Sequence, residues 1–98
     1  MISFIESADY FIGPKDSLCA DGMDLDLSKC KKAAEKLDIE FKGEEEEQSY
    51  PGGCYIHDGD EVYFNKNWQG TSDDYSKPIC GQGKYDKYFT KILELFSI

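Results

Sequence analysis

The clearest periodic pattern in the chain predicts an α-helix over residues 28–37. Four apolar side chains in this segment recur at intervals of three and four residues, which places them on one face of a helix. They are Cys30, Ala33, Ala34 and Leu37. Either Asp26 or Ser28 can cap the first turn by accepting a hydrogen bond from a free backbone N–H group. The helix is therefore expected to turn Cys30 toward the core.

A β-hairpin is predicted over residues 54–65. Two short runs, 54–57 and 62–65, are rich in aromatic and β-branched residues, and residues 58–61 between them contain an Asp-Gly pair typical of a turn. Successive side chains of a strand point to opposite faces. One face is expected to carry Cys54, Ile56, Val62 and Phe64, and the other Tyr55, His57 and Tyr63.

Other segments give weaker signals. Residues 2–12 alternate loosely between apolar and polar positions and are expected to hold one or two short strands, followed by a turn over residues 13–17. Residues 69–77 are polar and are predicted to form a loop. Residues 78–80 are predicted to form a short edge strand fixed by Cys80.

Residues 84–98 carry a second helical pattern with a broad apolar face. The side chains expected on this face include Tyr85, Phe89, Ile92 and Phe96. An amphipathic helix of this kind packs on its own sheet or docks into a groove of a partner protein, and both alternatives stay open. Residues 1–83 are predicted to form the folded module, with residues 84–98 as a C-terminal amphipathic helix.

The predicted fold class is α+β. The expected architecture is a small antiparallel sheet built on the hairpin of residues 54–65, with one packed helix, two disulfides and a C-terminal helix. A chain of 98 residues is long enough for one domain with one modest core. Small domains of this size commonly need covalent crosslinks, which directs attention to the cysteines.

The chain has four cysteines with no close pair among them. Structural zinc sites usually take ligands in close pairs such as Cys-x-x-Cys, so the spacing favours two disulfides over a metal centre. Disulfides persist in oxidising compartments, and a secreted or lumenal protein is therefore expected. The first residues do not resemble a secretory signal peptide, and we expect that such a signal has been removed.

The expected orientations of the cysteines favour one of the three possible pairings. Cys30 faces inward from the helix and Cys54 faces inward from the hairpin, so a helix packed on the sheet brings the two together. Cys19 and Cys80 then remain and clasp the two ends of the module. The alternative of Cys19–Cys30 with Cys54–Cys80 would leave the helix unattached to the hairpin.

The formal net charge of −9 excludes some classes of partner. Nucleic acids and anionic membrane surfaces are bound through lysine and arginine, and an acidic surface repels both. Three explanations of the negative net charge remain: binding of a basic protein, binding of calcium, and solubility alone. Residues 44–47 are four consecutive glutamates, which repel one another and are expected to form a solvated loop. Calcium sites need converging carboxylates, so no metal site is predicted there.

No catalytic arrangement emerges from the sequence, and no enzyme activity is expected. His57 is the only histidine, and a triad could draw only on Ser72 or Ser76 with Asp58. Adjacent strand residues point to opposite faces, so Asp58 is expected to be badly placed to orient His57. No glycine-rich phosphate loop precedes a helix, and no cofactor is predicted.

Aromatic residues near the hairpin are the stronger candidates for a binding surface. Tyr55, Tyr63 and Trp68 could form a platform on which a sugar ring or a peptide stacks. The alternative is that these residues only cover the second face of a thin fold. Both interpretations place them on the side of the hairpin that faces away from the helix.

Five short motifs occur in a set order along the chain. They are Ser17-Leu18-Cys19-Ala20-Asp21-Gly22, Cys30-Lys31-Lys32-Ala33-Ala34, Tyr50-Pro51-Gly52-Gly53-Cys54-Tyr55, Val62-Tyr63-Phe64-Asn65 and Pro78-Ile79-Cys80. This order resembles a four-cysteine module of predicted extracellular proteins of algae and other aquatic protists, a family without an assigned activity. The resemblance spans residues 8–81 and implies an extracellular or lumenal module. The glutamate-rich segment and the tail from residue 84 depart from the pattern.

The predicted function is a non-catalytic protein–protein interaction or assembly module in an extracellular, lumenal or virion setting. The alternative is a carbohydrate-binding module that uses the aromatic platform on the hairpin. A small hydrolase is a distant third interpretation. The partner is expected to be a protein in a larger assembly, with a glycan as the second candidate.

Overall fold

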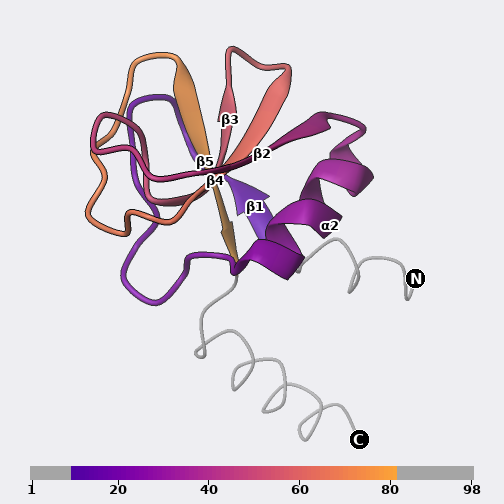
Figure 1. Cartoon of the computed structure of the whole chain (residues 1–98), viewed down its shortest axis with the longest axis horizontal. Helices are drawn as coiled ribbons and strands as arrows, with labels where there is room; N and C mark the ends of the chain where they lie inside the picture. The colour runs from indigo at the N-terminus through magenta and orange to yellow at the C-terminus, as the bar shows by residue number, and fades with distance from the viewer. Residues whose placement is uncertain (1–9, 82–98) are drawn as a thin grey trace, which may run out of the picture.

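The computed structural model describes residues 10–81, which form one sheet and one helix (Figure 1). The elements in chain order are β1 (Tyr10–Ile12), α2 (Leu27–Leu37), β2 (Glu40–Glu45), β3 (Gly53–His57), β4 (Glu61–Asn65) and β5 (Ser76–Gly81). The α+β class, the helix and the hairpin agree with the sequence prediction. The predicted strand from residue 2 and the predicted C-terminal helix, with Tyr85, Phe89, Ile92 and Phe96, lie outside the described residues.

The strands form a five-stranded sheet in the order β1-β5-β3-β4-β2. β3 and β4 form the predicted antiparallel hairpin, and β5 and β1 continue the antiparallel pairing on one side. On the other side β2 pairs with β4 in parallel, so the sheet is mixed and the prediction of an antiparallel sheet was wrong. β2 enters the sheet from the end of α2, and no tight hairpin turn forces it to run antiparallel to its neighbour.

The prediction that residues 44–47 form a loop was wrong for Glu44 and Glu45, because both belong to β2. Exposure alternates along this strand, so successive charges point to opposite faces instead of repelling one another at close range. β2 lies at the edge of the sheet, where charged side chains are tolerated. Phe41 in the same strand packs against the hydrophobic core and holds β2 in place.

β5 was predicted to be an edge strand, and this was wrong because β1 pairs with its outer side. In this pair Tyr10 is the register partner of Gly81, and Ile12 is the partner of Ile79. β5 therefore lies inside the sheet, with β3 on its other side.

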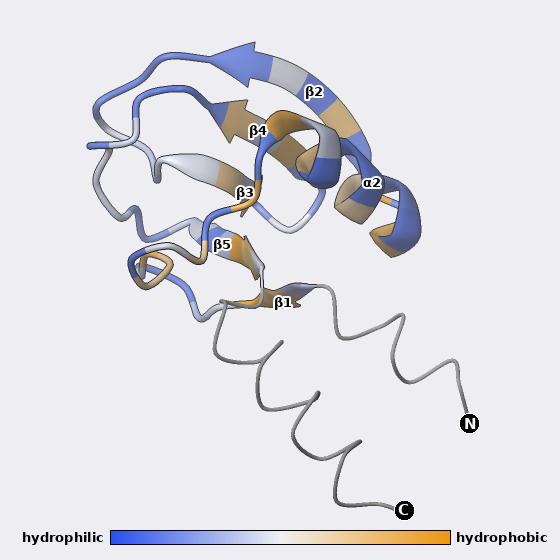
Figure 2. Cartoon of the chain, turned by 90° about the horizontal axis from the view of Figure 1, so that it is seen from below, coloured by the Kyte–Doolittle hydropathy of each residue, from blue (hydrophilic) through white to orange (hydrophobic). Residues whose placement is uncertain are grey.

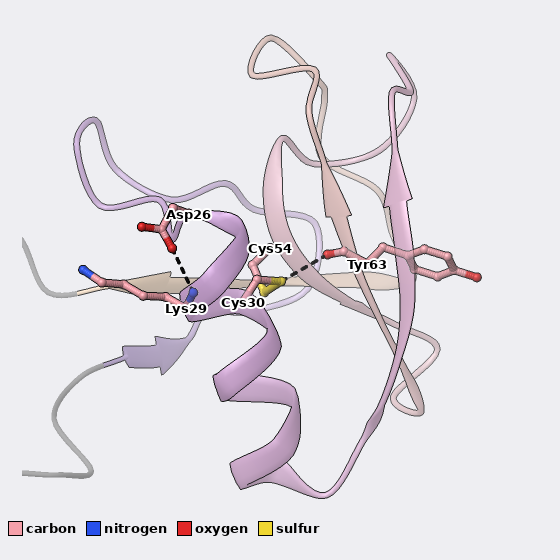
Figure 3. The surroundings of a disulfide bond; sticks show 5 residues. All are labelled: Asp26, Lys29, Cys30, Cys54 and Tyr63. Carbon is pink, nitrogen blue, oxygen red and sulfur yellow. Dashed lines mark hydrogen bonds between the residues drawn. A yellow bond between two sulfur atoms is a disulfide. The ribbon is translucent and has the colours of Figure 1, made fainter.

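The ends of α2 are both set by aspartates. Asp26 is the N-cap, and its side chain accepts a hydrogen bond of 2.8 Å from the backbone N–H of Lys29, as predicted (Figure 3). Asp38 adopts a left-handed conformation with φ of 58° and closes the helix through its backbone N–H. The helix ribbon carries both hydrophobic and hydrophilic residues (Figure 2). Its buried residues, Cys30, Ala33 and Ala34, all come from the predicted apolar face.

The hydrophobic core lies between α2 and one face of the sheet. The face of the hairpin predicted to point inward does so, and Leu25 and Ile79 complete the buried set. This core consists of Leu25, Cys30, Ala33, Ala34, Cys54, Ile56, Val62, Phe64 and Ile79. Because the two central helix positions are alanines, α2 can approach the sheet closely.

Two disulfides fix the chain to the sheet, and both have the predicted pairing. Cys30–Cys54 joins the first turn of α2 to β3, with a Cα separation of 5.4 Å (Figure 3). Cys19–Cys80 joins the segment before the helix to β5, with a Cα separation of 5.6 Å. Two disulfides in a small domain indicate an oxidising compartment. Within residues 10–81, no helix is long and apolar enough to cross a bilayer.

Each disulfide should stabilise the fold by an amount set by the loop that it closes. The sequence separations are 24 and 61 residues, for which the chain-entropy model gives about 3 and about 4 kcal/mol respectively. Replacing Cys30 and Cys54 together by alanine, or Cys19 and Cys80 together, should lower the free energy of unfolding by these amounts in urea titrations. Non-reducing peptide mapping checks the pairing: a linked peptide pair carrying Cys19 and Cys30 would contradict it.

Candidate functional site

The face of the sheet that points away from α2 contains an open hollow of about 500 Å³. Among the described residues, its lining combines three tyrosines, one histidine and four carboxylates, with no lysine or arginine. The lining residues are Glu45, Glu47, Tyr50, Tyr55, His57, Asp58, Glu61 and Tyr63. A concave surface with this combination of aromatic and acidic groups is the candidate functional site.

The β3–β4 hairpin positions half of these residues by simple strand alternation. Tyr55 pairs with Tyr63 across the hairpin, and His57 pairs with Glu61. Since their sequence neighbours point into the core, these four side chains point to the opposite face. Figure 3 shows the Tyr63 side chain extending from the sheet on the side opposite the Cys30–Cys54 disulfide.

The three tyrosine rings form a stacked row, with Tyr55 in the middle. The ring centroids of Tyr50 and Tyr55 are 5.9 Å apart with an interplanar angle of 10°. Those of Tyr55 and Tyr63 are 5.7 Å apart at 23°. The His57 ring meets Tyr50 edge-on at 5.5 Å. The neighbouring rings leave Tyr55 only 1% exposed, so Tyr50 and Tyr63 form the accessible part of the row.

The tyrosine hydroxyls hold two of the carboxylates in place. Tyr55 donates a hydrogen bond to Oε2 of Glu45, and Tyr63 donates one of 3.3 Å to Oε1 of Glu61. Burial and the hydrogen bond to Glu45 raise the pKa of Tyr55 above its usual range. Desolvation and the nearby Glu61 carboxylate raise the pKa of Tyr63 as well. Both phenols therefore remain hydrogen-bond donors at neutral pH, and each orients a carboxylate at the hollow.

Asn65 at the end of β4 positions the loop that supplies Glu47 and Tyr50. Its fully buried side chain accepts hydrogen bonds from the backbone N–H groups of Glu47 (2.9 Å) and Asn67 (3.1 Å). Its amide nitrogen donates to the carbonyl oxygens of Glu47 (2.7 Å), Tyr50 (3.1 Å) and Pro51 (3.1 Å). These five bonds fix the path of residues 47–51 over the sheet and so place Tyr50 against Tyr55.

A second loop, residues 66–75, packs against residues 47–51. Thr71 donates from its backbone N–H and from its hydroxyl to the carbonyl oxygen of Gln48, both at 3.0 Å. Gly70 lies so close to this loop that a Cβ atom would be 2.1 Å from the Tyr50 carbonyl oxygen. Only glycine allows this approach, so the two loops pack backbone against backbone.

The structure does not form the predicted platform of Tyr55, Tyr63 and Trp68. Tyr55 is buried between two other rings and presents no face to solvent. The Trp68 ring packs edge-on against Phe64 at 5.6 Å, and Phe64 belongs to the core face of β4. Trp68 is 56% exposed but does not line the hollow. Tyr63 is the one member of the predicted platform that reaches the hollow with an accessible ring.

His57 takes part in a hydrogen-bonded cluster that is not arranged as a catalytic triad. Ser76 donates its hydroxyl hydrogen to Oδ2 of Asp73 at 2.8 Å. Its oxygen can therefore only accept from Nδ1 of His57, 3.2 Å away. Ser76 is also fully buried, so no substrate carbonyl could reach it. The cluster orients the His57 ring beside Tyr50.

Asp58 was expected to be badly placed to orient His57 because of strand alternation, and that reason was wrong. Asp58 is a turn residue with φ of 54°, so strand alternation does not apply to it. Its Oδ2 lies 3.6 Å from Nε2 of His57. Within residues 10–81, no group of three or more histidine, cysteine, aspartate or glutamate side chains is arranged to hold a metal ion.

Sequence reasoning did not predict that Tyr50 and the four carboxylates of the hollow belong to one binding site. The signal for Glu61 was available, because alternation on the hairpin places it on the same face as Tyr63. Glu45 reaches the hollow only through the parallel pairing of β2 with β4, and Tyr50 only through the loop that Asn65 holds. Neither arrangement has a local sequence signal.

Replacing Asn65 with alanine should destabilise the fold and open the hollow. The substitution leaves buried backbone groups without partners, and we expect a loss of at least about 2 kcal/mol in the free energy of unfolding. Asn67→Ala is the matched control, because its side-chain bonds lie at the exposed surface; its effect should be below about 1 kcal/mol. Urea unfolding measures both, and equal effects would contradict the role of Asn65.

The stability of the protein should fall at alkaline pH because of Tyr55. Its pKa is raised in the folded state, so above about pH 10 the unfolded chain releases this proton while the folded chain keeps it. The stabilisation is complete below the ordinary tyrosine pKa and should decline by up to about 1.4 kcal/mol per pH unit above it. Tyr55→Phe should reduce this alkaline decline in urea titrations. Tyr75→Phe, at a tyrosine that is 64% exposed, should leave it unchanged.

Comparisons with protein-family models, with curated proteins and with solved structures give no match to this chain. The resemblance to a four-cysteine extracellular module therefore stays a prediction from the sequence motifs, and the hollow itself is the basis for assigning a function.

Proposed function

We propose that the protein is a non-catalytic protein-interaction module of a secreted or lumenal setting, and that it binds a basic segment of a partner protein in the hollow. One observation carries this proposal. Four carboxylates and three tyrosines line the same concave surface, and no lysine or arginine of residues 10–81 lies among them. The site is therefore built to attract positive charge.

The electrostatics of the hollow support a cationic ligand. Its carboxylates repel one another, and a bound cation relieves that repulsion. Lys42 approaches one of these carboxylates: its Nζ lies 4.0 Å from Glu61 and 3.7 Å from Glu40. Lys42 does not line the hollow, and such exposed contacts contribute little. The net charge of −9 adds a long-range attraction that would accelerate association with a basic partner.

The arrangement of polar groups favours recognition over catalysis. The hydroxyl of Ser76 is buried and already bonded to Asp73 and His57. The phenols of Tyr55 and Tyr63 are committed to carboxylates and keep their protons at neutral pH. What the hollow offers a ligand is ring surface and negative charge. Both suit a lysine or arginine side chain of a protein partner, since cations bind to aromatic faces as well as to carboxylates.

A binding experiment with short peptides tests the proposal. Uniformly 15N-labelled protein is titrated with a capped basic peptide and with an acidic peptide of the same length, and amide shifts are followed by NMR. Only the basic peptide should produce saturable shifts at the residues of the hollow. The affinity should fall as the salt concentration rises, because exposed charges are screened.

Charge-removing variants localise the effect. The double variant Glu47→Gln with Glu61→Gln should weaken binding by about fivefold or more, as expected for the loss of two charges facing the ligand. The matched control is Glu35→Gln with Glu44→Gln, which removes the same net charge outside the hollow. Equal losses in both double variants would contradict the site. Binding of neutral glycans on a glycan array, without binding of basic peptides, would favour the carbohydrate-binding alternative.

A further inference from the structure

We infer that a slot beside the Tyr63 ring receives an arginine side chain of the partner. The slot is bounded by Tyr63, Gly43, Glu45 and Glu61. This inference rests on the proposed function, because it identifies the chemical group that the hollow takes from a basic segment. The group that we expect in the slot is a planar guanidinium, and not any positively charged group.

The first observation is that the ring of Tyr63 stacks on a tyrosine from one of its two neighbouring strands. Tyr55 stacks against one face of the ring. On the other side lies β2, where the register partner of Tyr63 is Gly43. Apart from its chain neighbours Lys42 and Glu44, a Cβ atom at Gly43 would have no heavy atom within 4 Å, so no other segment packs on β2 at this position. Gly43 also has φ of 136°, a conformation that disfavours any residue with a side chain.

The second observation is that a glutamate follows Gly43 on β2 and another precedes Tyr63 on β4, on either side of this level of the sheet. β2 and β4 run parallel, and Gly43 and Tyr63 are at the same level in the sheet. Glu61 precedes Tyr63 by two residues on β4, and Glu45 follows Gly43 by two residues on β2. Two residues of a strand span about 7 Å along its axis, so the backbone positions of the two glutamates lie in opposite directions from the level of Tyr63. Hydrogen bonds from Tyr55 and Tyr63 orient them.

An arginine matches this geometry better than a lysine. The guanidinium group is planar and can stack on the free face of Tyr63 while its N–H groups reach a carboxylate at the edge. A lysine ammonium is a compact, strongly hydrated charge and cannot cover a ring face in the same way. Glu61 Oε1 already accepts from Tyr63, and within residues 10–81 Oε2 has only the 4.0 Å contact with Lys42. A second, bidentate partner can therefore replace that contact.

The test compares two peptides that differ in one side chain. The full oxidised protein, 15N-labelled, is titrated with acetyl-Gly-Gly-Arg-Gly-Gly-amide and with its lysine counterpart at low ionic strength. We expect the arginine peptide to bind about threefold or more tightly than the lysine peptide. The largest shifts should lie at Gly43, Tyr63 and their neighbours.

Three variants identify the ring as the source of this preference. Tyr63→Leu should reduce the ratio of the two affinities to about one, whereas Tyr63→Phe keeps the ring and should retain the preference. Tyr75→Leu removes an exposed tyrosine outside the hollow and should leave both affinities unchanged. The NMR spectrum of each variant reports directly whether it is folded.

The possible outcomes separate this inference from the proposed function. If both peptides bind equally, or if Tyr63→Leu keeps the preference for arginine, the arginine slot is wrong while the basic partner stands. If neither peptide produces saturable shifts at the hollow, both the slot and the proposed function are wrong.

Discussion

The hydrogen bonds of the buried Asn65 amide are the constraint on which the candidate site depends. A primary amide that is removed from water must satisfy its donors and its acceptor inside the protein, or the fold loses stability. Asn65 does so with five backbone groups of the two neighbouring loops. The observed path of residues 47–51 meets this requirement. The same bonds that satisfy a buried polar group therefore place Tyr50 and Glu47 at the hollow.

The two faces of the hairpin perform different tasks. One face packs against α2 with small and branched side chains, and the Cys30–Cys54 disulfide fastens it covalently. No helix in the described residues covers the opposite face, and stacked tyrosines shield it instead. Tyrosine suits this position because its ring buries apolar surface while its hydroxyl remains available to a polar group. The hollow thus lies on the face that aromatic side chains cover in place of a second helix.

Features that depend on residues close in sequence could be predicted. The helix follows from a short apolar repeat and an aspartate cap, and the hairpin follows from alternation around an Asp-Gly turn. The disulfide pairing followed from combining these two elements. The position of β2 could not be predicted, because its parallel pairing with β4 joins segments separated by the loop and by β3. In addition, a run of glutamates shows no alternation of residue type. The alternation of exposed and half-buried side chains that suits β2 to a sheet edge therefore cannot be recognised in the sequence.

The candidate site was harder to predict than the fold because its residues come from three separate segments. Tyr55 and Tyr63 were recognised as an aromatic pair, but Trp68 was grouped with them only because it is large and near in sequence. In the structure the chain passes Asn65 before it reaches Trp68, and that ring ends against Phe64 on the core side. Tyr50, which completes the row, precedes the hairpin and reaches it through contacts that only the folded loops provide.

The pairing of Tyr10 with Gly81 has a consequence for how this segment can be combined with other proteins. The two ends of the described segment are register partners in neighbouring strands, and Cys19–Cys80 holds the same region together. A unit whose ends lie side by side can be inserted into a surface loop of a host without either partner being stretched. Residues 10–81 therefore have the geometry of a domain that can be inserted into a host protein. Such an insertion would add the acidic hollow to the host.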